Sequence, residues 1–165
     1  MRYLCSVSSK YDINFNLPNQ NGYKPFHSVV GMMGRLQIVQ YVVENADLIG
    51  VDLNEPNADG WTPFHIASKN GNTEVVSYLM DNSKLKNINV AAVNDQWYSI
   101  TPFMASCRFS NCNPQTVQLY LKRADDLGID FRTVRQFPLF TNPLSLNPLK
   151  LNPQNSKSTP ICIPK

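Results

Sequence analysis

The sequence contains no run of apolar residues long enough to span a membrane, because a spanning helix needs about 18 or more of them in succession. It contains only two histidines and four cysteines among 165 residues, and none of them shows the paired spacing of a zinc site. Only 16% of the residues are charged, and the net charge is +3. We therefore expect no membrane span, no metal or other cofactor, and no nucleic-acid surface, which requires concentrated basic charge.

The charged residues are unevenly distributed along the chain. Residues 133–165 contain four bases and no acid, whereas residues 1–132 contain the other 11 bases (15 − 4) and all 12 acids. The four cysteines are irregularly spaced, which favours reduced thiols over a disulfide framework. The first residues are too polar for a secretory signal. We therefore expect an intracellular, cytoplasmic protein, with the nucleus as the alternative.

One phrase recurs along the chain. The sequence GYKPFH at residues 22–27 is followed by GWTPFH at residues 60–65 and by a shorter match, TPFM, at residues 101–104. Its prolines lie 38 (63 − 25) and 39 (102 − 63) residues apart. Periods of about 20 to 50 residues indicate a solenoid, in which each unit is too small to hold a core alone and stacks on its neighbours. The question of function therefore moves from a pocket to a surface.

Each unit predicts two helices. Threonine can cap a helix and proline suits its first position, so a helix is expected after each Thr-Pro or Lys-Pro step. We expect these first helices near residues 25–32, 63–70 and 102–109. Gly34 and Gly71 follow the first two of them and suit a positive φ. Apolar residues at helical spacing predict the second helices near residues 36–43, 75–80 and 117–121.

Residues 133–165 differ from the repeat. They contain six of the 12 prolines, and the motif Asn-Pro-Leu-x-Leu occurs twice in succession. Frequent proline excludes a continuous helix or a central strand, because it removes backbone donors. We therefore expect a disordered tail.

The repeat resembles the ankyrin repeat, whose units consist of a β-turn finger followed by two antiparallel helices. The match is best in the second unit, where DGWTPFHIA occupies residues 59–67 and Gly71 and Asn72 follow. The resemblance covers residues 3–131 and implies an all-α solenoid of stacked helix-turn-helix units with β-turn fingers. We expect a partial repeat at residues 1–18, repeats at 19–56, 57–93 and 94–132, the last of them divergent, and the tail at 133–165.

Three positions depart from the ankyrin pattern. Lys24 replaces the threonine of the first unit, and Met104 replaces the histidine of the third. Ser99 or Ile100 stands where the third finger should have glycine, and two additional residues enter this finger. Because most residues other than glycine are strained at positive φ, we expect the third finger to have a different shape.

The resemblance assigns a structural role to the repeated motif itself. In ankyrin repeats, the histidine hydrogen-bonds the backbone and ties neighbouring fingers together. This role explains His27 and His65 better than metal binding or general-base catalysis, because no further ligand with zinc spacing accompanies them. The residues with this structural role are Gly22, Pro25, His27, Gly60, Thr62, Pro63, His65, Thr101 and Pro102.

Aromatic residues of the fingers are candidates for partner binding. The resemblance implies that Trp61 and Trp97 project onto the concave face, where aromatic side chains bury a large area at low entropic cost. The alternative is that each packs on the next finger and stiffens the array. Met32 and Met33, in the loop between two helices, are expected to fill the core, with a soft apolar contact to a partner as the alternative. The surface candidates are Gln20, Tyr23, Ala58, Asp59, Trp61, Lys69, Trp97, Tyr98 and Arg108.

Asn54 follows Asp52 and Leu53 in a loop. This acidic-aliphatic-asparagine context is similar to sites at which an intracellular asparaginyl hydroxylase modifies ankyrin repeats. We therefore consider hydroxylation of Asn54, against the alternative that this asparagine only stabilises a turn.

No motif of the chain indicates catalysis, because it has neither a nucleophile elbow nor a phosphate-binding glycine loop. The resemblance implies a non-enzymatic module that presents a concave ankyrin surface to one or more partner proteins. The alternative is a truncated regulatory or scaffold fragment of a larger ankyrin protein, associated with a kinase, a phosphatase or a ubiquitin ligase. A third hypothesis gives the basic, proline-rich tail a partner of its own. Because both terminal units lack a polar cap, we also expect self-association through uncapped ends.

Overall fold

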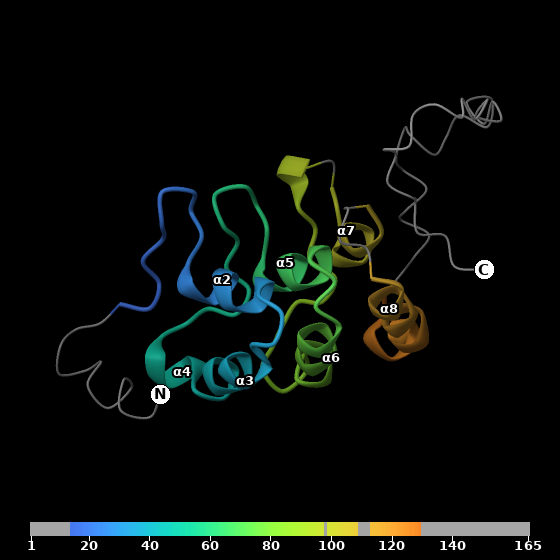
Figure 1. The fold of residues 1–165 in the computed structure, drawn as a ribbon, viewed down its shortest axis with the longest axis horizontal. Coiled ribbons are helices and arrows are strands. Elements are labelled where there is room, and N and C mark those ends of the chain that lie inside the picture. The colour runs from blue at the N-terminus through green and yellow to red at the C-terminus, as the bar shows by residue number, and fades with distance from the viewer. Residues whose placement is uncertain (1–13, 98, 109–112, 130–165) are drawn as a thin grey trace.

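The computed structural model describes residues 14–97, 99–108 and 113–129. Within these residues it contains seven α-helices, one short 3-10 helix, and no β-structure beyond a single bridge between Asn94 and Ile100. The helices stack as pairs, so the expected all-α solenoid is confirmed (Figure 1). The tail at 133–165 and most of the partial repeat at 1–18 lie outside the described residues.

The helices lie in two rows (Figure 1). The row next to the fingers contains α2 (Pro25–Gly31), α5 (Pro63–Lys69) and α7 (Pro102–Arg108). The other row contains α3 (Leu36–Glu44) with the short α4 (Ala46–Ile49), α6 (Thr73–Asp81) and α8 (Pro114–Leu127). Helix α5 packs between α2 and α7, and α6 packs between α3 and α8, so each unit shields the next. In the part of the chain that the structure describes, no helix has both the length and the apolar character to cross a bilayer.

A proline begins the first helix of each unit, and threonine caps this helix in the second and third units. Oγ1 of Thr62 accepts a hydrogen bond from the backbone N–H of His65 at 3.3 Å, and Thr101 caps α7 in the same way. Lys24 has no side-chain oxygen, and its backbone N–H donates instead to Nδ1 of His27 at 3.2 Å. All three first helices end within one residue of the position that the sequence predicts.

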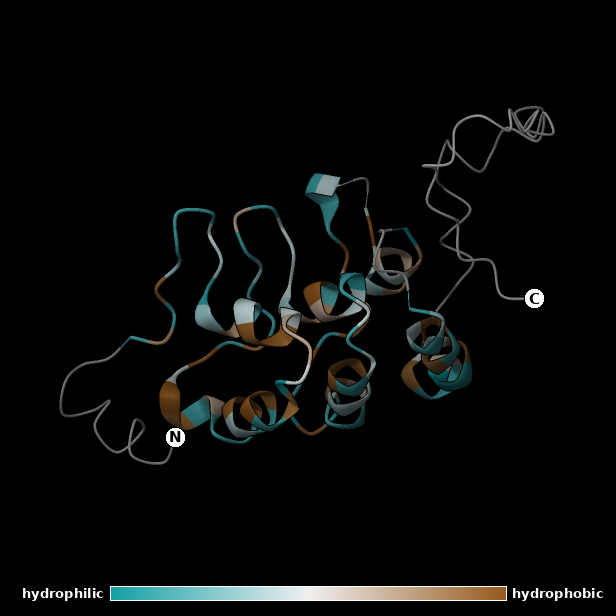
Figure 2. Cartoon of the chain, viewed as in Figure 1, coloured by the Kyte–Doolittle hydropathy of each residue, from teal (hydrophilic) through white to brown (hydrophobic). Residues whose placement is uncertain are grey.

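The core joins the units. Figure 2 shows most of the hydrophobic residues in the helices and hydrophilic residues at the finger tips. Tyr120 of α8 is fully buried, with ring centroids 6.2 Å from Phe64 of α5 and 5.5 Å from Phe103 of α7. Oγ of Ser68 donates to the carbonyl of Phe64 at 2.8 Å, so the Tyr120 hydroxyl is the donor in the 2.6 Å contact between the two hydroxyl groups. Burial raises the pKa of Tyr120. Burying such an aromatic ring contributes about 1.5–3 kcal/mol, so this contact holds the last two units together.

The loop between α2 and α3 corrects one prediction. Met32 and Met33 are exposed, by 55% and 72%, rather than buried in the core. The second unit contacts the backbone of this loop rather than its side chains. Nδ2 of Asn72 donates to the backbone carbonyls of Val30 and Met32 at 3.2 and 3.1 Å. The two methionine side chains therefore remain at the surface. Gly34 closes the loop with a φ of +71°, as predicted.

Candidate protein-binding surface

Three loops project from the helix rows, and we name them fingers 1, 2 and 3: residues 19–23, 57–61 and 94–100 (Figure 1). Each finger begins with an asparagine whose side-chain oxygen accepts a hydrogen bond from the backbone N–H two residues later, at 3.0–3.1 Å. The N–H of that asparagine donates to the carbonyl of the last finger residue, at 2.9, 3.0 and 2.9 Å. The sequence interpretation did not single out Asn19, Asn57 and Asn94, although asparagine recurs at this one position of the repeat.

Finger 3 differs from the other two, as its sequence predicts. It is two residues longer, and Asp95–Trp97 form a 3-10 turn. Ser99 has a φ of +53° at the position where fingers 1 and 2 have glycines with φ of +73° and +77°. Its hydroxyl donates to the carboxylate of Asp95 at 3.2 Å and so supports this strained residue. The added residues extend the tip of finger 3 and include Trp97.

The fingers pack directly against one another. A Cβ atom at Gly22 would lie 2.4 Å from Cβ of Ala58, and one at Gly60 would lie 2.5 Å from Oδ1 of Asn94. Nδ2 of Asn94 donates to the carbonyl of Asp59 at 3.0 Å, which links finger 3 to finger 2. Glycine at these two positions therefore allows close approach as well as positive φ. The three fingers form one mutually supported row.

His65 links α5 to finger 3. Its Nε2 lies 2.9 Å from the carbonyl oxygen of Ile100, which can only accept, so Nε2 carries the proton. Nδ1 is then the acceptor for the hydroxyl of Thr62, 2.8 Å away. Burial lowers the pKa of His65 to about 4, and the ring is therefore neutral at pH 7. Both of its nitrogens are used in holding the fold.

His27 occupies the corresponding place in the first unit. Burial lowers its pKa, and the nearby carbonyls of Glu55 and Trp61 offset only part of that effect. Tyr23 packs edge-on against His27 with ring centroids 6.0 Å apart, as Trp61 packs against His65 at 5.7 Å. Both histidines are buried between neighbouring units, where they support the fingers.

Trp61 is buried rather than exposed on the concave face. Only 3% of its surface is accessible, because the tip of finger 3 and the end of α5 cover it. The ring centroid of Trp97 is 6.1 Å away, and Nζ of Lys69 lies 4.9 Å from the Trp61 ring. A cation over an indole contributes roughly 0.5–2 kcal/mol. The structure thus supports the interpretation in which Trp61 stiffens the array.

Trp97 is the exposed aromatic residue of this cluster. Its accessible fraction is 45%. Two hydrogen bonds within finger 3 fix the backbone of Trp97. Its N–H donates to the carbonyl of Asn94, and its carbonyl accepts from the N–H of Ile100, each at 3.3 Å. An aromatic side chain that is already ordered loses little conformational entropy when a partner buries it.

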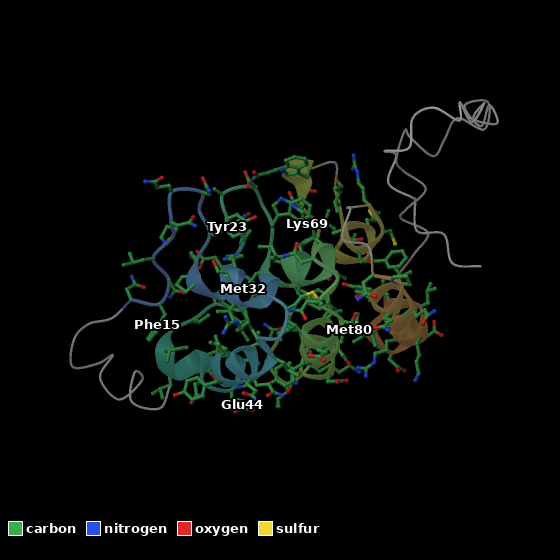
Figure 3. The ribbon with its side chains drawn as sticks, in the orientation of Figure 1. Phe15, Tyr23, Met32, Glu44, Lys69 and Met80 are labelled. Atoms are coloured by element: carbon green, nitrogen blue, oxygen red, sulfur yellow. The ribbon has the colours of Figure 1, made fainter. Side chains whose placement is uncertain are left out.

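The other surface candidates lie on the fingers and at the ends of the adjoining helices. Gln20, Ala58, Asp59 and Arg108 are exposed, and Tyr23 and Lys69 are half-buried. Tyr98 lies outside the described residues. Figure 3 shows Tyr23, Met32 and Lys69 on the fingers and the helix row next to them, whereas Glu44 lies on the other row. Exposed Met32, which sequence reasoning assigned to the core, thus belongs to the same side of the molecule as the candidates.

Asn54 connects the first unit to the second. Its Nδ2 donates to the carbonyl of Asn87 at 2.8 Å, and its Oδ1 accepts from the N–H of Asn89 at 2.7 Å. Its own N–H donates to the carboxylate of Asp52 at 2.8 Å. The side chain is therefore engaged in stabilising the stack. Hydroxylation of Asn54 stays a prediction.

The described residues contain no group of three His, Cys, Asp or Glu side chains that could hold a metal ion. The strongly shifted pKa values belong to His65 and Tyr120, which are buried and hydrogen-bonded within the core. Such groups stabilise the fold and have no access to a substrate. The arrangement is suited to binding at a surface.

Comparison with known families identifies the repeat. Residues 47–131, which are 85 of the 165 residues (131 − 47 + 1), match a family model described as ankyrin repeats (3 copies). This segment runs from α4 past the end of α8 and includes fingers 2 and 3. A comparison with curated protein sequences finds no match.

Proposed function

Because the chain belongs to the ankyrin repeat family, whose repeats generally mediate protein–protein interaction, we propose that it is a non-enzymatic binding module. The binding surface is the concave face formed by fingers 1 to 3 and by α2, α5 and α7. The partner is a protein, and the interaction takes place in the cytoplasm, where irregularly spaced cysteines stay reduced.

One observation carries this proposal: the only two tryptophans of the chain form a pair in which one is buried and the other is exposed. Trp61 is a rigid support, and Trp97 on top of it keeps 45% of its surface accessible. Interfaces derive much of their binding energy from a few such aromatic anchors. Trp97 is therefore the anchor, and the surrounding finger tips provide a polar rim.

The repeat boundaries form part of the proposal. Repeats at 19–56, 57–93 and 94–132 begin with Asn19, Asn57 and Asn94, the residues that open fingers 1, 2 and 3. Each proposed repeat thus starts where a finger starts. The partner surface then consists of three fingers, each contributed by one repeat.

The test is affinity capture of partners by the full chain, compared between wild type and Trp97→Ala. We expect the affinity of the variant for its specific partners to fall by roughly thirtyfold or more, because truncating an anchor residue costs about 2 kcal/mol or more of binding energy. Leu48→Ala is the matched control, since Leu48 is an exposed apolar residue on α4, in the other row. Equal recovery by wild type and Trp97→Ala would contradict the proposal, provided that both unfold at the same temperature.

A further inference from the structure

The helices next to the fingers carry charge of only one sign. The sequences of α2, α5 and α7 contain no aspartate or glutamate. Their charged residues are Lys69 and Arg108, which are the last residues of α5 and α7. The floor of the concave face is therefore basic in its second and third units.

The two basic residues occupy the same position of the repeat. Lys69 lies six residues after Pro63, and Arg108 lies six residues after Pro102. They are therefore one stacking step apart, and packed helices are about 8–10 Å apart. A peptide in the extended polyproline II conformation has three residues per turn and rises about 3.1 Å per residue, so its side chains at positions i and i+3 lie on the same face and cover about one step.

An aromatic surface adjoins this basic pair. Nζ of Lys69 lies 4.9 Å from the Trp61 ring, and the Trp61 ring lies 6.1 Å from that of Trp97. A partner segment that reaches Lys69 therefore passes close to the exposed face of Trp97. Asp59 and Asp95 lie on the fingers, so carboxylates of a partner are repelled from the finger tips and attracted to the helix ends.

We propose that this surface binds an extended acidic peptide segment in which two carboxylates are three residues apart and an apolar side chain lies beside them. One carboxylate pairs with Lys69 and the other with Arg108, while the apolar side chain packs on Trp97. This inference rests on the proposed function and names the chemistry of the partner at the same site.

Peptide display tests the inference. A library of random 12-residue peptides is selected on the full-length protein, on Lys69→Ala/Arg108→Ala, on Trp97→Ala, and on Lys84→Ala/Lys122→Ala. The last variant is the matched control, because it removes the same charge from exposed lysines beyond α6 and on α8. We expect peptides with acidic residues at positions i and i+3 to be enriched by wild type and by the control. Their binding should fall at least tenfold on the Lys69→Ala/Arg108→Ala variant.

The outcomes separate the two proposals. Enriched peptides that depend on Trp97 but show no acidic pair would overturn the inference and leave the proposed function standing. Acidic peptides that bind the Lys69→Ala/Arg108→Ala variant as well as wild type would also overturn it. Selection that recovers no peptide dependent on Trp97 would overturn both.

Discussion

At the scale of single residues, His65 shows how one side chain can join two units. Its two ring nitrogens bond Thr62 in its own unit and Ile100 in finger 3. The bond from the Thr62 hydroxyl needs the neutral ring, because Nδ1 can accept a hydrogen bond only when it carries no proton. Since burial lowers its pKa to about 4, the ring stays neutral in the folded protein under conditions that protonate it in the unfolded chain.

His65 should therefore make the protein less stable as the pH decreases. Below the unfolded pKa of 6.5 the unfolded state binds a proton that the folded state excludes, so the free energy of unfolding decreases until about pH 4. Between pH 7 and pH 4.5 we expect His65 to account for a loss of roughly 2–3 kcal/mol. Urea unfolding of wild type and His65→Gln at both pH values measures this loss. If both proteins lose the same stability on acidification, His65 is not the cause.

At the scale of structural elements, the finger loops and the loops between helices need glycine for different reasons. Gly60 and Gly34 have similar positive φ values, +77° and +71°. A Cβ atom at Gly34 would meet nothing within 4 Å, whereas one at Gly60 would lie 2.5 Å from the buried side chain of Asn94. Asn94 cannot move aside without losing its hydrogen bonds to Asp59 and Gln96.

We expect Gly34→Ala to cost about 1–2 kcal/mol, because it only forces alanine into the left-handed region. Gly60→Ala should cost at least about 1 kcal/mol more, since it also displaces a buried amide and breaks a link between fingers. Chemical unfolding of the two variants compares these costs directly. Equal losses for both variants would show that the fingers are not packed as closely as described.

At the scale of the whole molecule, stacking decides which apolar residues are buried. The second helices of the three units can be compared at one position, the eighth residue of each helix. This residue is Val43 in α3, Met80 in α6 and Leu121 in α8. Val43 and Met80 are almost completely buried, because the next helix of the row covers them, whereas Leu121 is 50% exposed. The outer side of α8 is thus an apolar face of the repeat without a covering unit among the described residues.

Substitutions at this repeated position should have unequal effects. Met80→Ala should destabilise the protein by about 2–5 kcal/mol, because it leaves a cavity between α6 and α8. Leu121→Ala should change the stability by less than about 1 kcal/mol. Thermal unfolding measures both effects. A loss for Leu121→Ala as large as that for Met80→Ala would show that the face is covered in solution, and a dependence on protein concentration would identify a second copy as the cover.

Local sequence signals were sufficient to predict the repeat, its helix pairs and the altered third finger. Threonine or proline before a helix, glycine after it and the spacing of apolar residues act through the backbone within a few residues, so they can be read from the chain. The outcome for Trp61 and Trp97 could not be predicted in this way. Their exposure depends on a contact between two fingers that are 36 residues apart in sequence (97 − 61), in which the tip of finger 3 covers Trp61 and leaves Trp97 exposed.

The sequence by itself thus determined that this protein is a stack of ankyrin repeats, because each unit encodes its own turns and helices. The tertiary structure decided which side chains form the surface. In it, Met32, Met33 and Leu121 are exposed to solvent. The side chain of Asn54 forms hydrogen bonds between two units. These results depend on how neighbouring units cover one another, and that covering is a property of the assembled stack.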